Sequence, residues 1–229
     1  MAGAEPKKNS DLGVRTASAV VMVAIAGTAL WLGGWVWTAF VAAVALGVLW
    51  EWTRLARAIA GSTLAMLGWQ VAGAAYVGLG ATMLAGLGSV AGFPDVLLAL
   101  VAGVIATDVG AYFAGRTFGG PKIAPRISPS KTWSGLGGGM LGATLALWFV
   151  ATQVAHWNLV KSLPWLLAMG SVLAITAQAG DFFESWMKRR AGVKDSSHLI
   201  PGHGGLFDRV DGLLAVCFVL GLISFPQLF

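Results

Sequence analysis

Long apolar segments separated by short polar ones dominate this chain of 229 residues. Several of these segments reach or approach the roughly 20 residues that a helix needs to cross a bilayer. Backbone groups in lipid must be hydrogen-bonded within their own segment, and the runs are too long for barrel strands, so we expect helices. The pattern predicts an all-α polytopic integral membrane protein with about seven transmembrane helices, over residues 16–33, 35–56, 63–88, 95–115, 133–154, 163–186 and 208–227.

The segments form one domain, without an internal repeat or an interdomain linker. Residues 1–14 are polar and are predicted to be a cytoplasmic tail, and residues 15–229 to be one membrane-embedded domain with its catalytic half at about 95–229. The first apolar run could be a signal peptide with a basic lead. However, a second run follows at once without a small-residue cleavage pattern, which favours an uncleaved span.

Two glycine-rich stretches bear on this topology. Residues 63–88 could be one tilted helix, or a helix plus a re-entrant piece. Two complete spans there would put the main basic loops on opposite sides of the membrane, so we expect one crossing. The spacings Gly135/Gly139 and Gly138/Gly142 predict close helix packing, because small residues let helix backbones approach.

Composition agrees with a membrane protein, since 57% of the residues are apolar and 11% are charged. A soluble domain carries roughly a quarter charged residues. The net charge of +5 does not indicate nucleic-acid binding, because no basic patch with interleaved aromatic residues lies outside the membrane loops. The single cysteine, Cys217, lies in an apolar run and is expected to be a buried apolar residue.

The basic residues orient the chain. With the N-terminus inside, 14 of the 15 lysines and arginines fall on the cytoplasmic side, and Lys161 alone falls outside. This distribution obeys the positive-inside rule. The cytoplasmic residues are Lys7, Lys8, Arg15, Arg54, Arg57, Arg116, Lys122, Arg126, Lys131, Lys188, Arg189, Arg190, Lys194 and Arg209. The residues from Arg116 to Lys131 make one basic cytoplasmic loop, and those from Lys188 to Arg209 make a second.

The few carboxylates lie close to these loops. Asp108 lies within the fourth span, and Asp181 and Glu184 share one face of the sixth span at i, i+3 spacing. Asp208 and Asp211 repeat that spacing at the start of the seventh. Structural ion pairs with neighbouring arginines are one interpretation. Carboxylates at membrane depth are otherwise costly unless a cation accompanies them, so five together favour a cation site.

Oxygen ligands without a histidine or cysteine cluster indicate Mg²⁺ rather than zinc. Magnesium surrounded by lysine and arginine is typical of sites for phosphate and pyrophosphate. The glycine-bearing segment 201–205 leads into the N-terminus of the last helix, which favours bound anions. Together these features predict nucleotide-phosphate chemistry at the cytoplasmic membrane surface.

The stretch from Ser185 to Asp211 resembles the signature of the phosphatidate cytidylyltransferases, or CDP-diacylglycerol synthases. The fixed positions of that signature are met by Ser185, Lys188, Arg189, Lys194, Asp195, His203, Gly204, Gly205, Asp208, Arg209 and Asp211. Upstream, the segment Gly180–Ser185, the helix end from Asp108 to Arg116 and the pair Glu51–Trp52 are also similar to family motifs. The chain departs from the family at Ser130 and Ser134, where a lysine and a glutamate are usual.

The resemblance implies transfer of a cytidylyl group from CTP to phosphatidic acid, releasing pyrophosphate, in a bacterial inner membrane with the site facing the cytoplasm. Asp181 and Asp208 are expected to hold the principal Mg²⁺. A second cation such as K⁺ is expected nearby, with Glu184, Asp211 and Asp108 as further candidate ligands. The expected phosphate-binding cations are Lys188, Arg189, Lys194 and Arg209, and the further substrate contacts are Ser128, Lys131, Thr132, Ser185, Asp195, His203, Gly204 and Gly205.

Two alternatives use the same residues. A polyprenol or phytol kinase would transfer the terminal phosphoryl group of CTP and release CDP, and the Ser185–Asp211 signature argues against it. An ion transporter would spread its carboxylates through the membrane, whereas most lie here near the cytoplasmic ends of the spans. The expected partners are therefore CTP, phosphatidic acid and the lipid bilayer, with no nucleic acid. The resemblance also suggests a homodimer.

Overall fold

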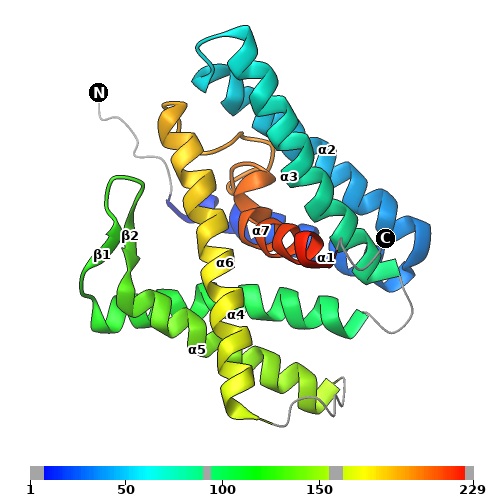
Figure 1. Ribbon diagram of the computed structural model, residues 1–229, viewed down its shortest axis with the longest axis vertical. Helices are drawn as coiled ribbons and strands as arrows, with labels where there is room; N and C mark the ends of the chain where they lie inside the picture. Colours follow the sequence, from blue (N-terminus) through cyan, green and yellow to red (C-terminus); the bar gives the residue numbers. More distant parts are fainter. Residues whose placement is uncertain (1–7, 90–93, 155–161, 225–229) are drawn as a thin grey trace.

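The computed structural model describes residues 8–89, 94–154 and 162–224 of the chain. Helices make up most of this part of the chain (Figure 1). They are α1 (Lys8–Leu32), α2 (Gly34–Ile59), α3 (Thr63–Ser89), α4 (Pro94–Phe118), α5 (Trp133–Phe149) with a short π-helical extension (Val150–Val154), α6 (Leu163–Arg190) and α7 (Phe207–Ser224). Lys7, His156, Lys161 and the predicted end of the last span lie outside the described residues.

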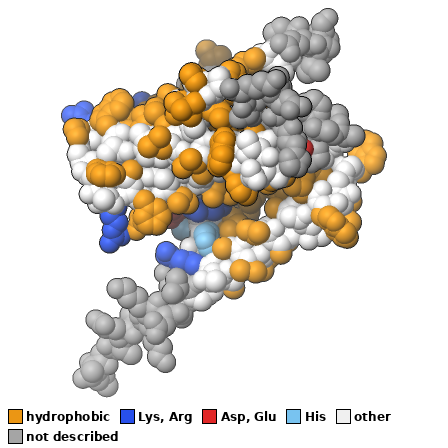
Figure 2. Space-filling model, turned by 90° about the horizontal axis from the view of Figure 1, so that it is seen from below, with side chains coloured by type: hydrophobic (Ala, Val, Ile, Leu, Met, Phe, Trp, Pro, Cys, Tyr) orange, Lys and Arg blue, Asp and Glu red, His pale blue; other side chains and the backbone are white. Residues whose placement is uncertain are grey.

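Six of the helices, α1 to α6, are long and apolar enough to cross a membrane. The exterior is covered by apolar side chains, as Figure 2 shows for one face. Trp31 and Trp35, at the turn between α1 and α2, are 84% and 88% exposed. Such a surface suits lipid rather than water, so the predicted all-α polytopic membrane fold is confirmed. The seventh helix, α7, has 18 residues and carries Asp208, Arg209 and Asp211 near its start.

The helix boundaries differ from the prediction in informative places. The glycine-rich stretch 63–88 is one continuous helix, as expected. By contrast, α1 begins at Lys8 and so extends through half of the expected polar tail. The loop after α4 holds a small antiparallel hairpin that the hydrophobic pattern did not predict, made of β1 (Lys122–Ala124) and β2 (Ser128–Thr132).

Thr132 joins this hairpin to α5, because its hydroxyl accepts a hydrogen bond of 3.0 Å from the backbone N–H of Gly135. This is the usual way in which a threonine caps a helix N-terminus. The cap fixes the direction in which β2, and therefore Lys131, meets the beginning of α5. The sequence 132–135 thus positions a lysine as well as starting a helix.

Helices α4 and α5 pack with their backbones in contact (Figure 1). A side chain at Gly110 would overlap the backbone of Gly138, and one at Gly142 would overlap the carbonyl of Ala106. A side chain at Gly139 would make a tight contact of 3.1 Å with the carbonyl oxygen of Thr107 of α4. The predicted role of the Gly-x-x-x-Gly spacings in helix packing is therefore confirmed.

An aromatic cluster joins α2, α3, α6 and α7 near the carboxylates. Trp52 of α2 is 1% exposed and donates a hydrogen bond of 2.8 Å from Nε1 to the carbonyl oxygen of Trp69. Its ring packs against Phe183 of α6 and Phe207 of α7, with centroids 5.7 and 6.0 Å away. Aromatic pairs at these distances stabilise packing beyond the area they bury. The cluster therefore holds the C-terminal end of α6 against the beginning of α7.

Candidate active site

The end of α6 and the beginning of α7 bring the predicted carboxylates together. Asp181, Glu184 and Lys188 follow one another at three- and four-residue spacing, so they share one face of α6. Close helix packing makes this face reach α7. A side chain at Gly180 would lie 2.5 Å from the carbonyl oxygen of Asp211 and from the β-carbon of Ala215. Glycine at position 180 therefore permits the approach that the site needs.

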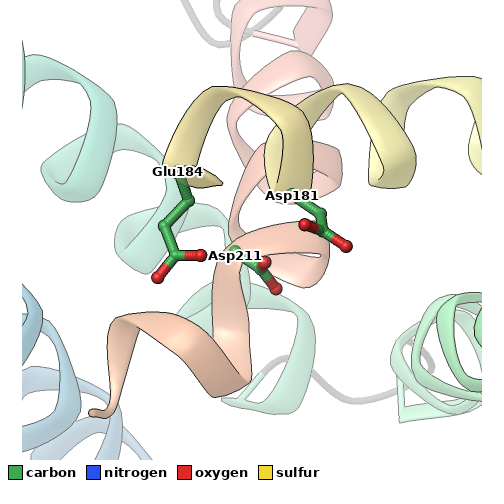
Figure 3. A group of neighbouring side chains, drawn as sticks. All are labelled: Asp181, Glu184 and Asp211. Carbon is green, nitrogen blue, oxygen red and sulfur yellow. The ribbon is translucent and has the colours of Figure 1, made fainter. Parts of the chain in front are cut away.

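Three carboxylates converge at this contact (Figure 3). Asp181 and Glu184 extend from α6 and Asp211 extends from α7, and one carboxylate oxygen of each lies within 4.8 Å of the others. The Glu184 side chain is 1% exposed, and its Oε1 atom has no hydrogen-bond partner in the described part of the chain. A buried, unpaired carboxylate oxygen is unfavourable. The three side chains are thus suited to hold a divalent cation, for which oxygen is the preferred ligand.

Lys131 contacts the same cluster from the hairpin. Its ammonium group forms an ion pair with Asp181 and lies 4.8 Å from the centre of the Phe182 ring. Beside it is a cavity of about 500 Å³ between α4, β2 and α6, here called the first cavity. Its polar lining residues are Asp108, Tyr112, Arg116, Lys122, Ser130, Lys131, Thr132 and Gln178. The predicted ligand Asp108 therefore faces this cavity, with three basic residues around it.

Asp208 has different neighbours from the other carboxylates. Lys188 donates to Glu184 Oε2 at 2.6 Å and to Asp208 Oδ1 at 2.5 Å. The second oxygen of Asp208 accepts from the Ser196 N–H and hydroxyl at 2.9 and 2.8 Å, and from the Gly205 N–H at 2.8 Å. Asp208 therefore ties the loop 191–206 to α7. Asp181 is grouped with Glu184 and Asp211 instead, and a cation shared by Asp181 and Asp208 stays a prediction.

The other predicted residues lie at the end of α6, in a second cavity, or outside both cavities. Ser185 donates to Asp181 Oδ1 at 3.2 Å, and the exposed Arg189 donates to the carbonyl oxygen of Val193 at 3.3 Å. A second cavity, also of about 500 Å³, is lined by residues predicted to bind phosphate or to contact the substrates. These are Lys194, Asp195, His203, Gly204 and Arg209. Gly205 is buried against Ser196, and Ser128 begins β2 outside both cavities.

The two serines that depart from the family pattern lie in the hairpin region. Ser134 donates to the carbonyl oxygen of Gly119 and lies 3.0 Å from the Thr132 hydroxyl. Ser130 lines the first cavity, and its carbonyl oxygen accepts a hydrogen bond of 3.5 Å from Lys122. Ser134 therefore connects the end of α4 to the start of α5. The glutamate that is usual at this position in the family has a longer side chain than serine and would extend beyond these contacts.

Glu51 of α2 belongs to the pair Glu51–Trp52, which resembles a family motif, but its contacts were not predicted from the sequence. It is fully buried, and its carboxylate accepts four hydrogen bonds. One comes from the Ser197 hydroxyl at 2.5 Å, and two come from the backbone N–H groups of Leu206 and Phe207, at 2.9 and 2.7 Å. The fourth comes from the Ser196 hydroxyl at 3.0 Å, whose single proton is shared with Asp208 Oδ2 at 2.8 Å. Glu51 thus fixes the loop before α7 from a distant helix.

Known proteins resemble the chain over nearly all of its length. The profile of the Cytidylyltransferase family matches residues 13–93 and 61–225. A phosphatidate cytidylyltransferase of Brucella suis is 36% identical over 261 residues, which cover 94% of this chain and 94% of that protein. Another, of Rickettsia bellii, is 32% identical and covers 96% of this chain and 94% of its own length. A third, of Haemophilus influenzae, is 45% identical over 114 residues, or 49% of this chain and 39% of that protein. The chain therefore belongs to the cytidylyltransferase family.

Proposed function

We propose that this protein is a phosphatidate cytidylyltransferase, which converts CTP and phosphatidic acid to CDP-diacylglycerol and pyrophosphate. Relatives that carry this name match the chain over 94% of its length. The structural observation that carries the proposal is the convergence of Asp181, Glu184 and Asp211 beside Lys131 and Lys188. Carboxylates for a cation and lysines for phosphate oxygens are the equipment that nucleotidyl transfer needs.

The reaction needs no protein nucleophile. An anionic phosphate oxygen of phosphatidic acid attacks the α-phosphorus of CTP, and the bond from that phosphorus to the bridging oxygen of the β-phosphate breaks. Pyrophosphate leaves with the bonding electrons, so no proton has to be transferred. The protein must therefore align two polyanions and neutralise their charge. Lys131, Lys188 and Arg209 are the cations that we assign to this task.

We propose that Mg²⁺ is bound by Asp181, Glu184 and Asp211, with Asp108 as a further oxygen donor from the first cavity. The unpaired Oε1 of Glu184 supports this assignment. When bound, Mg²⁺ supplies positive charge to the phosphate oxygens. Lys131 and Lys188, which pair with members of the cluster, then hold its carboxylates in place. A second cation, such as K⁺, remains part of the proposal, as does a role for Asp208 as its ligand.

We further propose that α7 is a seventh crossing and that the active site faces the cytoplasm of a bacterial inner membrane. An α-helix of 18 residues is about 27 Å long, which is close to the thickness of the hydrocarbon core. Under the positive-inside rule, the basic residues near the ends of α2, α4 and α6 favour a cytoplasmic position for those ends. This orientation suits a water-borne nucleotide and a lipid held in the bilayer. We also propose a homodimer, which helices with small-residue faces permit.

The test is product analysis with purified protein in detergent micelles that contain phosphatidic acid, Mg²⁺ and CTP labelled in the cytosine ring or at the γ-phosphate. We expect labelled CDP-diacylglycerol and labelled pyrophosphate in equal amounts. Asp181→Asn should abolish both products. Asp95→Asn makes the same chemical change in the first turn of α4, at the end of that helix away from the first cavity, and should leave both products unchanged. Release of CDP with phosphorylated lipid would instead identify a kinase, and absence of either product would refute the proposal.

A further inference from the structure

The second cavity has the chemistry of an anion site. It carries three basic side chains, Arg15, Lys194 and Arg209, and the imidazoles His198 and His203, against one carboxylate, Asp195. Its volume of about 500 Å³ lies within the usual range for small-molecule sites. Ile200 and Pro201 are its only large apolar lining residues within the described chain. A water-borne polyanion therefore suits it better than a lipid with two acyl chains.

The N-terminal helix α1 forms one wall of this cavity. Arg15 of α1 lines it, although the other lining residues lie between positions 194 and 209. A side chain at Gly202 would come within 2.9 Å of Arg15 Cγ, so helix and loop are in direct contact. Gly202 also has a φ of 75°, a conformation that residues with side chains rarely adopt. Figure 2 shows basic and histidine side chains in the hollow between one helix and the body of the molecule.

Ser18, one helical turn after Arg15, contacts the histidine of the cavity. Its hydroxyl lies 2.8 Å from Nδ1 of His203 and 3.0 Å from the carbonyl oxygen of Pro201. This contact occupies one ring nitrogen, whichever atom carries the proton. The second nitrogen, Nε2, makes no hydrogen bond to the described residues, and it can donate one to an anion when Ser18 donates to Nδ1 or when the ring carries both protons. Ser18 therefore fixes the orientation of the His203 imidazole, although the two residues are 185 positions apart in sequence.

We propose that α1 is part of the nucleotide site, where Arg15 binds the triphosphate of the nucleoside triphosphate and Ser18 positions His203 against it. This inference rests on the proposed function for the identity of the nucleotide. The cavity brings a cation from α1 to the phosphate-binding loop, and the serine keeps the imidazole turned toward the ligand. Arg15 is thus a binding residue, and Ser18 is a positioning residue that acts through His203.

The experiment compares Ser18→Ala, Ser18→Thr and Arg15→Gln with the wild type in the full-length protein. Because one correctly placed hydrogen bond contributes about 1 kcal/mol, Ser18→Ala should raise KM for CTP roughly fivefold, and KM for phosphatidic acid should stay unchanged. Ser18→Thr keeps the hydroxyl and should restore most of the affinity for CTP. Arg15→Gln should raise KM for CTP roughly tenfold. Arg57→Gln, an exposed basic residue of α2, is the matched control and should behave as wild type.

Equal changes in both KM values, or failure of threonine to rescue the alanine variant, would overturn the role of Ser18. An unchanged KM for CTP in Arg15→Gln would overturn that of Arg15. Equilibrium binding of labelled CTP without lipid separates this inference from the proposed function. Weaker binding by Ser18→Ala would support the α1 site even if no lipid product forms. Wild-type binding by both variants, alongside normal product formation, would refute the α1 site and leave the proposed function standing.

Discussion

Replacing Glu51 with glutamine should destabilise the protein, because the four hydrogen bonds of its buried carboxylate cannot all survive. One carboxylate oxygen, Oε1, accepts from the Ser197 hydroxyl and the Leu206 N–H. The other, Oε2, accepts from the Ser196 hydroxyl and the Phe207 N–H. Glutamine turns one of these oxygens into an NH₂ group. A serine hydroxyl can rotate and accept from this group, but a backbone N–H cannot.

The magnitude follows from that count. One buried N–H at the start of α7 loses its acceptor, which costs about 1–3 kcal/mol. The negative charge beside the helix N-terminus is also lost, which costs about 0.3–1 kcal/mol. The free energy of unfolding should therefore fall by about 1–4 kcal/mol, and the midpoint of thermal unfolding by roughly 3–16 °C for a chain of this size.

The assay is thermal unfolding of the purified protein in one detergent, followed by the loss of monodisperse protein after heating. Asp95→Asn is the matched control, since it makes the same chemical change in the first turn of α4. A midpoint for Glu51→Gln within about 1 °C of the control would refute the reasoning. It would mean that the loop 191–206 does not depend on the acceptors that Glu51 offers.

Three further predictions concern the carboxylate cluster. Gly180→Ala should force α6 and α7 apart and lower both stability and product formation, whereas Gly137→Ala, where a side chain meets open space, should change neither. Product formation and thermal unfolding that are the same in the two variants would contradict this. Lys131→Met should lower turnover roughly 10²-fold in product assays by removing the cation beside Asp181, and unaltered turnover would exclude that role. Asp211→Asn should shift the Mg²⁺ activation curve to concentrations at least about tenfold higher, since one of three ligands is neutralised, and an unshifted curve would remove Asp211 from the cation site.

The membrane spans could be predicted because they depend on local properties of the sequence. A long apolar run must become a helix in lipid, and the positions of α2 to α6 follow from that requirement. The packing of α4 on α5 was also predictable, since the spacing of Gly138 and Gly142 leaves a surface without side chains. The start of α1 at Lys8 was missed because polar residues can continue a helix beyond the apolar segment.

The grouping of the site residues could not be predicted from spacing alone. Asp208 and Asp211 are three residues apart on one helix, yet Asp211 joins the cluster of α6 while Asp208 contacts Lys188 and Ser196. That division depends on the path of the loop before α7. Glu51 sets part of this path from 155 residues earlier in the chain. Neither contact leaves a periodic signal in the sequence.

The two cavities differ in their surroundings, and this difference bears on where each substrate binds. Tyr112 of α4 lines the first cavity and is 56% exposed, and its neighbour Phe113 is 62% exposed. From there α4 continues as one of the helices that are long and apolar enough to cross a membrane. The second cavity lies between the loop 191–206, Arg15 of α1 and Arg209 of α7. A lipid must keep its acyl chains in the bilayer while its phosphate meets the cations, and the exposed aromatic side chains at the first cavity suit such a lipid. We therefore expect the phosphate of phosphatidic acid to bind near Arg116 and Lys122, and to meet the nucleotide at the carboxylate cluster.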